Sequence, residues 1–316
     1  MKVNYFLFVT VAFGLFGHDL MGQNGYRYQI DAQNDNDYYL AYLSDKYYSN
    51  GIFFNYRWMS KKDLVPEYPK KIWQIKTGQQ IYTPYKSQID SSSQIDRPFA
   101  AYLHVGVSLH LLRADESSHR VTLNIGTIGA NAQGEKMQKL YHKTIRIFHP
   151  RGWEFQLRDE VGINIVYNYL KLLYSSKNRV VDIGLPVEIR LGNTFSGISM
   201  GALFRFGKLN PYYVSAYTNS LTGWKDNKTE RSFEYYFYVQ PQWHYVAYDA
   251  TIQGRLFGKD DENAKPLKHM VLGTELGGSF STKQWTIKCS AHFKTKEVDN
   301  HTKPHKYGSI SLAYRF

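Results

Sequence analysis

Two polar segments of the sequence carry side chains that could perform chemistry. The first contains Asp35, Asn36 and Asp37, and it is followed by Ser49 in a polar stretch, residues 45–51. Carboxylate and amide oxygens are hard donors of the kind that Ca²⁺ prefers, so Asp35, Asn36 and Asp37 are candidate metal ligands. The alternative is an acidic turn that is simply solvated.

The second segment, from Asn131 to Phe148, has helical periodicity and carries His142. Its cationic residues fall on one stripe, and apolar residues cover much of another. Such a helix is suited to lie on a lipid surface that carries phosphates, where the basic stripe would form charge-assisted contacts. The candidate substrate-binding residues of this stripe are Lys136, Lys139, Lys143 and Arg146.

His142 would be a titratable group at the lipid–water boundary, able to act as a general base near neutral pH. A serine nucleophile is weakly supported, because the Gly-x-Ser-x-Gly match at 197–201 lies within an expected strand and not at the strand-to-helix turn that forms a nucleophile elbow. The remaining chemistry is a histidine that activates water while a metal ion stabilises the oxyanion. A surface histidine on a solvated helix is the alternative.

The composition restricts the class of protein that could hold these residues. The chain has 316 residues, of which 43% are hydrophobic and 16% aromatic, with 27 Tyr. This aromatic content argues against disorder, and Tyr-rich strands are typical of the girdles at a membrane interface. The single cysteine, Cys289, excludes an intrachain disulfide and a thiolate zinc site.

The net charge of +12 is spread along the chain, and no basic helix is followed by a nucleic-acid reader motif. An anionic membrane surface therefore fits better than a nucleic acid, and no protein partner is implied.

The first 22 residues read as a secretory signal peptide, with a positive start, an apolar core over 5–16 and cleavage near Gly22. The apolar core is shorter than the ~18–20 residues of a spanning helix. Residues 23–316 then form one domain. A secreted chain without disulfides indicates the envelope of a Gram-negative bacterium.

Several windows alternate apolar and polar residues with a period of two, which predicts strands with one apolar and one wet face. The clearest windows are 103–111, 181–191, 285–293 and 309–316. Several exceed the ~5–6 residues of a soluble strand and approach the ~9–11 that cross a bilayer. We therefore predict an all-β, transmembrane antiparallel β-barrel of about 12 strands (12–14), with a short helix in an extracellular loop. A soluble sandwich is the alternative.

The strands are expected at 26–34, 49–58, 72–83, 99–113, 118–128, 158–174, 179–192, 197–206, 211–219, 233–241, 244–257, 267–280, 284–296 and 306–316. Strand parity predicts that Ser49 faces the lumen. Short turns at 175–178, 207–210 and 282–283 should form one rim. Longer loops at 86–97, 129–157, 223–231, 258–266 and 297–304 should form the other.

An ordered series of motifs resembles the lipid A 3′-O-deacylase (LpxR) family. No single piece is specific, but the set is collinear over residues 30–170. The pieces are Asp35-Asn36-Asp37, Asp45-x-Tyr-Tyr-Ser-Asn-Gly51, Tyr82-Thr-Pro84, Arg97-Pro-Phe-Ala-Ala-Tyr102, Gly134-Glu-x-x-Gln138-x-x-x-His142 and Gly152-Trp-x-x-Gln-Leu-x-x-Glu160. In the C-terminal half the match is mainly Tyr248-Asp-Ala-Thr-Ile-Gln-Gly254 and the closing strand.

The resemblance implies a twelve-stranded outer-membrane barrel and Ca²⁺-dependent hydrolysis of the ester that holds the 3′-acyloxyacyl group on lipid A. It implies that His142 is the general base. Asn36 and Asp37 match the Asn-Asp pair near the metal and the ester, with Asn34-Asp35 as the alternative register. Ser49 stands where the family usually has Thr.

Three further positions follow from the resemblance. Lys86 is the candidate for an essential Lys of the family, and Arg97 is a candidate substrate-binding residue. A family Glu that follows the His has no match within 143–148, which leaves Glu154 or Glu160.

The expected function is an outer-membrane lipid A deacylase acting on lipopolysaccharide in the outer leaflet. The alternatives are an outer-membrane phospholipase and a non-catalytic barrel or pore that has kept these motifs. A barrel of this size is mostly filled by side chains, which disfavours a wide pore.

Overall fold

The computed structural model describes residues 26–40, 46–60, 70–86, 88–223, 233–257 and 261–316. The predicted signal peptide, residues 1–22, lies outside this part of the chain and stays a prediction.

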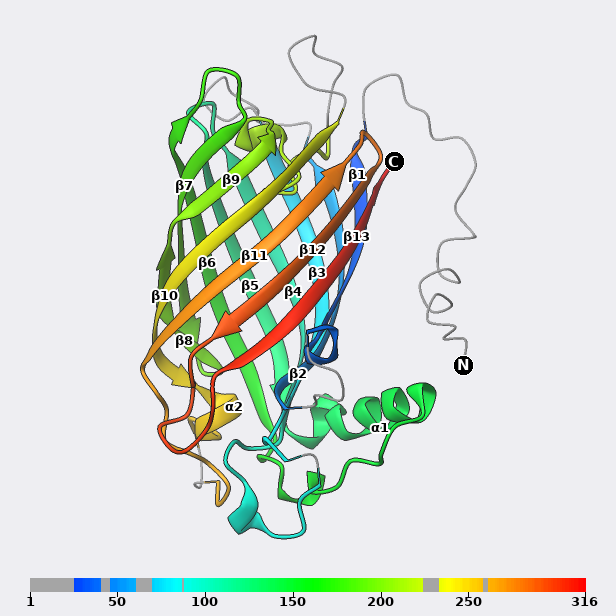
Figure 1. Ribbon diagram of the computed structural model, residues 1–316. Helices are drawn as coiled ribbons and strands as arrows, with labels where there is room; N and C mark the ends of the chain where they lie inside the picture. The colour runs from blue at the N-terminus through cyan, green and yellow to red at the C-terminus, as the bar shows by residue number, and fades with distance from the viewer. Residues whose placement is uncertain (1–25, 41–45, 61–69, 87, 224–232, 258–260) are drawn as a thin grey trace.

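The described residues form a closed antiparallel barrel, with the first strand paired to the last (Figure 1). The strands are β1 (Tyr28–Asn36), β2 (Tyr47–Met59), β3 (Lys70–Thr83), β4 (Ala100–Leu112), β5 (Ser117–Ile128), β6 (Glu160–Ser175), β7 (Val181–Gly192), β8 (Phe195–Gly201), β9 (Leu203–Lys208), β10 (Glu234–Asp249), β11 (Met270–Ser281), β12 (Trp285–Lys294) and β13 (His305–Arg315). The short strands β8 and β9 share one place between β7 and β10, so the described chain makes a 12-strand barrel, as predicted.

Side chains alternate between the two faces of the wall, because successive residues of a strand point to opposite sides. In β4, Val105 and Val107 are exposed on the outside, whereas His104 and Ser108 are buried toward the lumen. The apolar outer face suits a bilayer, and the polar inner face lines a cavity of about 710 Å³. The predicted alternation of 103–111 is therefore confirmed.

The expected strands 233–241 and 244–257 form the single strand β10, which ends at Asp249, and the expected strand 197–206 is divided into β8 and β9. The expected strand 211–219 is wrong. The chain after β9 instead enters the barrel, where a short 3-10 helix (Tyr212–Val214) and its neighbours form a buried cluster. The expected hairpin turn at 207–210 is not formed either, because Lys208 ends β9 and the inserted segment begins at 209. We call residues 209–223 the plug. Its apolar side chains pack on aromatic residues of the inner wall. Its backbone has side-chain partners in place of a strand ladder, among them Glu234 and Ser220.

The plug is held by a buried ionic network around Arg205 on β9. The guanidinium binds Asp182 at 2.5 Å and approaches Glu234 at 3.5 Å, and all three side chains are at most 1% exposed. It also donates to the hydroxyl of Ser215 in the plug, at 2.8 Å. Glu234 accepts hydrogen bonds from the backbone of the plug, including Ala216 N–H at 2.6 Å.

The plug lies at the rim where the chain turns from β11 to β12, near the C-terminus (Figure 1). β9 and β10 meet at this rim, where Lys208 pairs with Tyr235, and Gly223 is the only residue of the expected loop 223–231 that the structure describes. Residues 224–232 themselves lie outside the described part.

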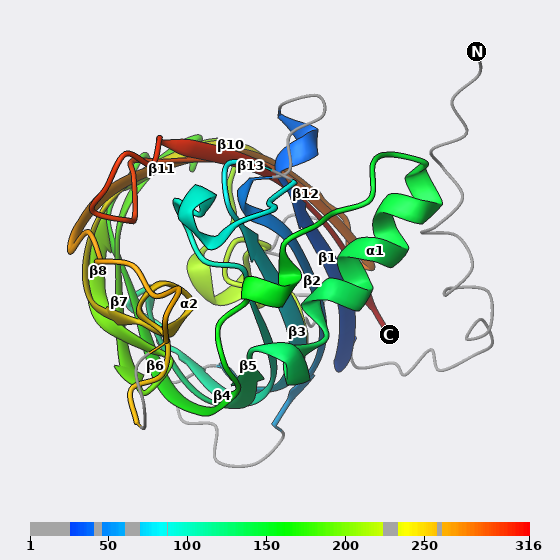
Figure 2. The same cartoon turned by 90° about the horizontal axis from the view of Figure 1, so that it is seen from below.

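The opposite rim carries the two α-helices of the described chain, α1 (Gly134–Ile145) and α2 (Ala250–Gln253). Seen from below, α2 lies over the lumen, whereas α1 projects outside the barrel wall (Figure 2). The short helix predicted within loop 129–157 is thus confirmed. No helix among the described residues is long and apolar enough to cross a membrane.

Candidate functional site

Helix α1 presents one buried face to the outer side of the barrel. Gly134, Gln138 and His142 are its buried residues, and they share a face because they are spaced four residues apart. The wall beneath them is β3 and β4. Tyr82 and Tyr102 line the lumen, so the residues next to them, Ile81 and Ala101, face outward toward the helix.

Gly134 makes this close approach possible. A Cβ added at Gly134 would lie 2.4 Å from the Cβ of Ala101 and 2.7 Å from the Cη2 of Trp153. Both distances are far below van der Waals contact, so a larger residue would lift the helix from the wall. The segments that contain Ala101, Gly134 and Trp153 are distant in the sequence and meet at this point.

Trp153 fixes the middle of the helix. It is 1% exposed, and its Nε1 donates a hydrogen bond of 2.5 Å to the Oε1 of Gln138. The chain reaches Trp153 through Gly152, whose φ of +110° is a left-handed conformation that L side chains rarely adopt. The Gly-Trp dipeptide thus acts as a clamp for α1, a role that its spacing alone did not indicate.

His142 is 2% exposed and has a defined orientation. Its Nδ1 lies 2.8 Å from the carbonyl oxygen of Phe148, and its ring packs edge-on against the Phe148 ring. Because a carbonyl can only accept, Nδ1 carries the proton in this bond and Nε2 is the acceptor. The left-handed C-cap residue Arg146, with φ of 58°, turns the chain back so that Phe148 can reach the histidine.

The acidic segment at the end of β1 divides between the two faces of the wall. Asp35 lines the lumen, where its carboxylate accepts hydrogen bonds from Tyr48 and Gln33, both at 2.8 Å. Asn34 has the opposite parity, and its side chain donates to the Gly51 carbonyl at 2.9 Å. The pair Asn34-Asp35 therefore points to opposite sides and cannot act as one unit.

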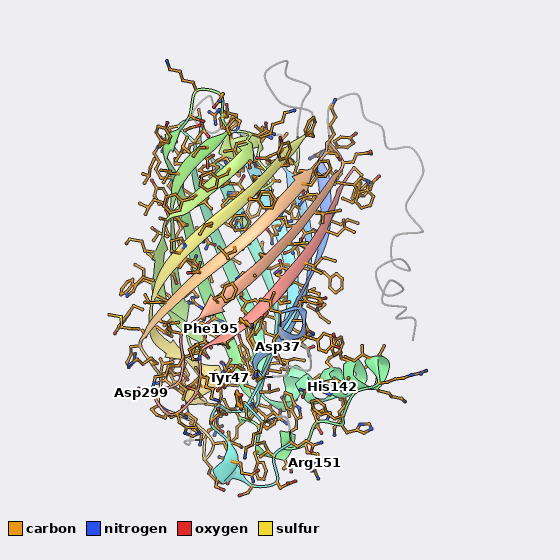
Figure 3. All side chains as sticks on the ribbon, in the orientation of Figure 1. Asp37, Tyr47, His142, Arg151, Phe195 and Asp299 are labelled. Atoms are coloured by element: carbon orange, nitrogen blue, oxygen red, sulfur yellow. The ribbon has the colours of Figure 1, made fainter. Side chains whose placement is uncertain are left out.

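The later pair is buried at the rim, where β1 ends. The Oδ1 of Asn36 accepts from Tyr38 N–H at 2.8 Å and so begins the 3-10 helix η1 (Asp37–Tyr39). The Oδ2 of Asp37 accepts from Lys46 N–H at 2.9 Å. Asp37 and His142 lie at the same rim of the barrel (Figure 3). This position favours Asn36-Asp37 over Asn34-Asp35 as the candidate pair near the ester.

The expected inward orientation of Ser49 is wrong. Tyr48 pairs with Tyr82 and Asn50 pairs with Ile81, so Ser49 is the extra residue of a β-bulge. The bulge shifts the parity, and Tyr48 rather than Ser49 lines the lumen. The Ser49 hydroxyl is buried and lies 3.4 Å from the Ile81 carbonyl oxygen.

The predicted metal ligands fit Ca²⁺ in part. Asp35 faces the lumen, so it does not converge with Asn36 and Asp37. Within the described residues, no group of three His, Cys, Asp or Glu side chains is placed to hold a metal ion. Asn36 and Asp37 still offer an amide and a carboxylate, and Ca²⁺ commonly completes its shell with backbone, water and substrate oxygens.

The predicted cations divide into two groups. Lys136, Lys139, Lys143 and Arg146 are all exposed on α1, and Lys139 forms an ion pair with Glu135. Arg97 instead is 1% exposed and lies in the mouth of the barrel, with its guanidinium 4.3 Å from the Tyr82 ring centroid. The structure does not bring Arg97 to the basic face of α1.

The remaining predicted residues lie on the surrounding loops. Lys86 is exposed in the segment that follows β3, and Glu154 is exposed near Trp153. Glu160 begins β6 and accepts from the backbone N–H groups of Leu256 and Phe257, at 3.3 and 3.4 Å.

Comparison with known proteins agrees with this architecture. A model of the family described as "Outer membrane protein LpxR" matches residues 6–316. The solved structure of LpxR from Salmonella typhimurium is 19% identical with a TM-score of 0.71, covering 91% of this chain and 100% of that one. The beta domain of the Bordetella autotransporter BrkA is 8% identical with a TM-score of 0.50, covering 92% and 99%.

At these identities the two solved structures show the barrel fold alone. No match was found among curated proteins. The family match, by contrast, spans nearly the whole chain, and it shows that this protein belongs to the LpxR family of outer-membrane proteins.

Proposed function

We propose that the protein is an outer-membrane lipid A deacylase, which hydrolyses the ester of the 3′-acyloxyacyl group. Family membership supports the substrate class. The observation that carries the proposal is the orientation of His142, which is buried against the lipid side of the wall with Nδ1 held by the Phe148 carbonyl. A base in this position would meet a lipid ester without drawing it into the lumen.

In this mechanism, Nε2 of His142 accepts a proton from water as the oxygen attacks the ester carbonyl. The hydrogen bond from Nδ1 to Phe148 keeps the ring oriented and stabilises the imidazolium that forms. The imidazolium then returns its proton to the departing sugar oxygen, which releases the fatty acid and leaves a hydroxyl on the glucosamine. The amide of Asn36 would donate to the oxyanion.

The exposed cations of α1 would bind the glucosamine phosphates from the solvent side. Lys136, Lys143 and Arg146 are exposed, and phosphate oxygens accept charge-assisted hydrogen bonds from such groups. These contacts would hold the headgroup beside the helix while the acyl chains stay in the leaflet.

Mass spectrometry of lipid A is the direct test. Cells that express the chain should contain lipid A that has lost the mass of its 3′-acyloxyacyl group, whereas cells without the chain should not. Unchanged lipid A would reject the proposal. Phospholipid from the same cells is assayed in parallel, because loss of acyl chains from phospholipid alone would indicate a phospholipase.

Chelation should lower the rate if Asn36 and Asp37 hold Ca²⁺. When bound, Ca²⁺ would polarise the ester carbonyl, and loss of such a Lewis acid is expected to slow hydrolysis at least roughly tenfold. The measurement is fatty-acid release by the purified protein in EGTA, followed by addition of Ca²⁺. A rate that is equal in EGTA and in Ca²⁺ would remove the metal from the proposal and leave the histidine in place.

Gly134→Ala is expected to lower the rate by roughly tenfold, because displacement of α1 moves His142 away from the reacting ester. Alanine would favour the helix itself by about 1 kcal/mol, so the loss would come from the clash with Ala101 and Trp153. The second substitution Ala101→Gly should restore part of the activity, since it removes the nearer of the two atoms. Full activity in the single variant would contradict the packing argument.

A further inference from the structure

Two lysines from different loops meet on one exposed aromatic ring at the α1 rim. The Nζ of Lys46, just before β2, lies 4.4 Å from the ring centroid of Tyr85. The Nζ of Lys303, just before β13, lies 4.6 Å from the same centroid, so the two ammonium nitrogens are within 9.0 Å of each other. We call Lys46, Tyr85 and Lys303 the rim cluster.

A buried polar network holds the backbone of the rim cluster. Asp96 is 5% exposed, and its carboxylate accepts from Tyr85 N–H and from the Tyr47 hydroxyl, both at 2.9 Å. The Tyr47 oxygen in turn accepts from Lys303 N–H at 3.0 Å, and Asn300 donates to the Asp96 carbonyl at 2.6 Å. The network therefore fixes the loops, while Lys303 is exposed and Lys46 is half-buried.

The two ammonium groups of the rim cluster concentrate positive charge around one ring. Among the described residues, neither ammonium group forms an ion pair, and Asp96 is already engaged by the network beneath. The charge of Lys46, and to a smaller extent that of Lys303, lowers the pKa of the Tyr85 phenol. Two like charges at this spacing repel each other, and such a concentration of positive potential favours an anionic ligand.

The rim cluster adjoins the candidate catalytic pair. The backbone N–H of Lys46 donates to the Asp37 carboxylate at 2.9 Å, so the rim cluster and the candidate pair are directly joined. A lipid whose ester reaches Asn36 and Asp37 would bring its sugar headgroup over Tyr85, which is 38% exposed. The ring offers a flat apolar surface with a polar tip, and lysines bind oxyanions as point charges.

We propose that the rim cluster binds an oxyanion carried by the headgroup sugars of the lipid A substrate, as a subsite of the proposed deacylase on whose function this inference rests. Two sources share this chemistry: a phosphate on the glucosamine backbone and the carboxylate of an acidic core sugar. The cluster is separate from the basic stripe of α1, because its residues come from the loops that precede β2 and β13 and follow β3.

The test uses the full-length protein with Lys46→Gln and Lys303→Gln, singly and together. Each substitution is expected to raise KM for the lipid that carries the bound oxyanion by roughly tenfold with kcat unchanged, because one charge-assisted contact is lost. Lys177→Gln, an exposed lysine on the opposite rim, is the matched control and should leave KM unchanged. Heat-modifiable migration in gels verifies that each variant is folded.

Three substrates identify the source of the oxyanion: lipid A, lipid A stripped of phosphate, and lipid A that carries acidic core sugars. If a phosphate is bound, the variants and the wild type should have equal KM on the stripped lipid. If a carboxylate is bound, the KM increase should appear on the core-bearing lipid alone. An unchanged KM of the double variant on all three lipids would overturn the subsite.

A binding measurement separates this inference from the proposed function. The dissociation constants of the same variants for the same lipids in detergent micelles require no turnover. Weaker binding of the double variant, together with absence of hydrolysis by the wild type, would keep the subsite and reject the deacylase. Wild-type affinities in the double variant would reject the subsite even where hydrolysis is normal.

Discussion

Replacing His142 by alanine is expected to reduce fatty-acid release from lipid A by about 10²–10⁴-fold while the barrel remains folded. The ring is the group that would take the proton from water. Its Nδ1 hydrogen bond to Phe148 lies outside the barrel strands, so its loss should not destabilise them. The measurement is the rate of release by purified wild type and variant, with refolding followed by heat-modifiable migration and by circular dichroism.

His149→Ala is the matched control, because His149 is exposed in the segment that follows α1. It should leave the rate within about twofold of wild type, as expected for a surface substitution. A variant His142→Ala that keeps more than a tenth of the wild-type rate would exclude this histidine as the general base. The base would then have to be sought among other groups at the same rim.

Arg205→Met is expected to lower the free energy of unfolding by about 3–5 kcal/mol, because it leaves Asp182 and Glu234 buried without their cation. The side chains of all three are at most 1% exposed, so water cannot replace the lost contacts without rearrangement of the plug. Denaturant unfolding in detergent gives the stability. Planar bilayer recordings give a second readout, since a displaced plug should produce a higher conductance than that of the wild type.

Lys268→Met serves as the control for that experiment. Lys268 approaches Asp299 at 3.9 Å, and the two side chains are 42% and 57% exposed. Exposed pairs of this kind contribute about 0–1 kcal/mol, so neither stability nor conductance should change measurably. A loss in Arg205→Met no larger than in Lys268→Met would show that the network does not hold the plug.

Most of the barrel could be predicted from the sequence, because each spanning strand has one face in lipid and one in a polar lumen. Period-two alternation is the direct consequence of this difference between the two faces. The plug does not lie between lipid and lumen, so its sequence is not constrained to alternate. Tyr212 and Leu221 pack on residues of the inner wall in a buried cluster, so the expected strand over 211–219 does not form.

The site could be predicted in part. His142 and the pair Asn36-Asp37 were identified from their motifs, and the structure buries all three at one rim. The bulge at Ser49 could not be read from the sequence, because one extra residue in β2 reverses parity without any change in composition. The rim cluster was missed because residues 46 and 303 are distant in the chain and are joined through Asp96.

Attachment of α1 to the outer side of the wall has a consequence for kinetics (Figure 2). A catalytic group that meets its substrate from the side encounters molecules that diffuse in two dimensions. The relevant concentration is then the mole fraction of lipid A in the surrounding leaflet, not the amount per volume of solution. Dilution of the surface with inert lipid would therefore slow turnover even when the bulk quantity of substrate stays the same.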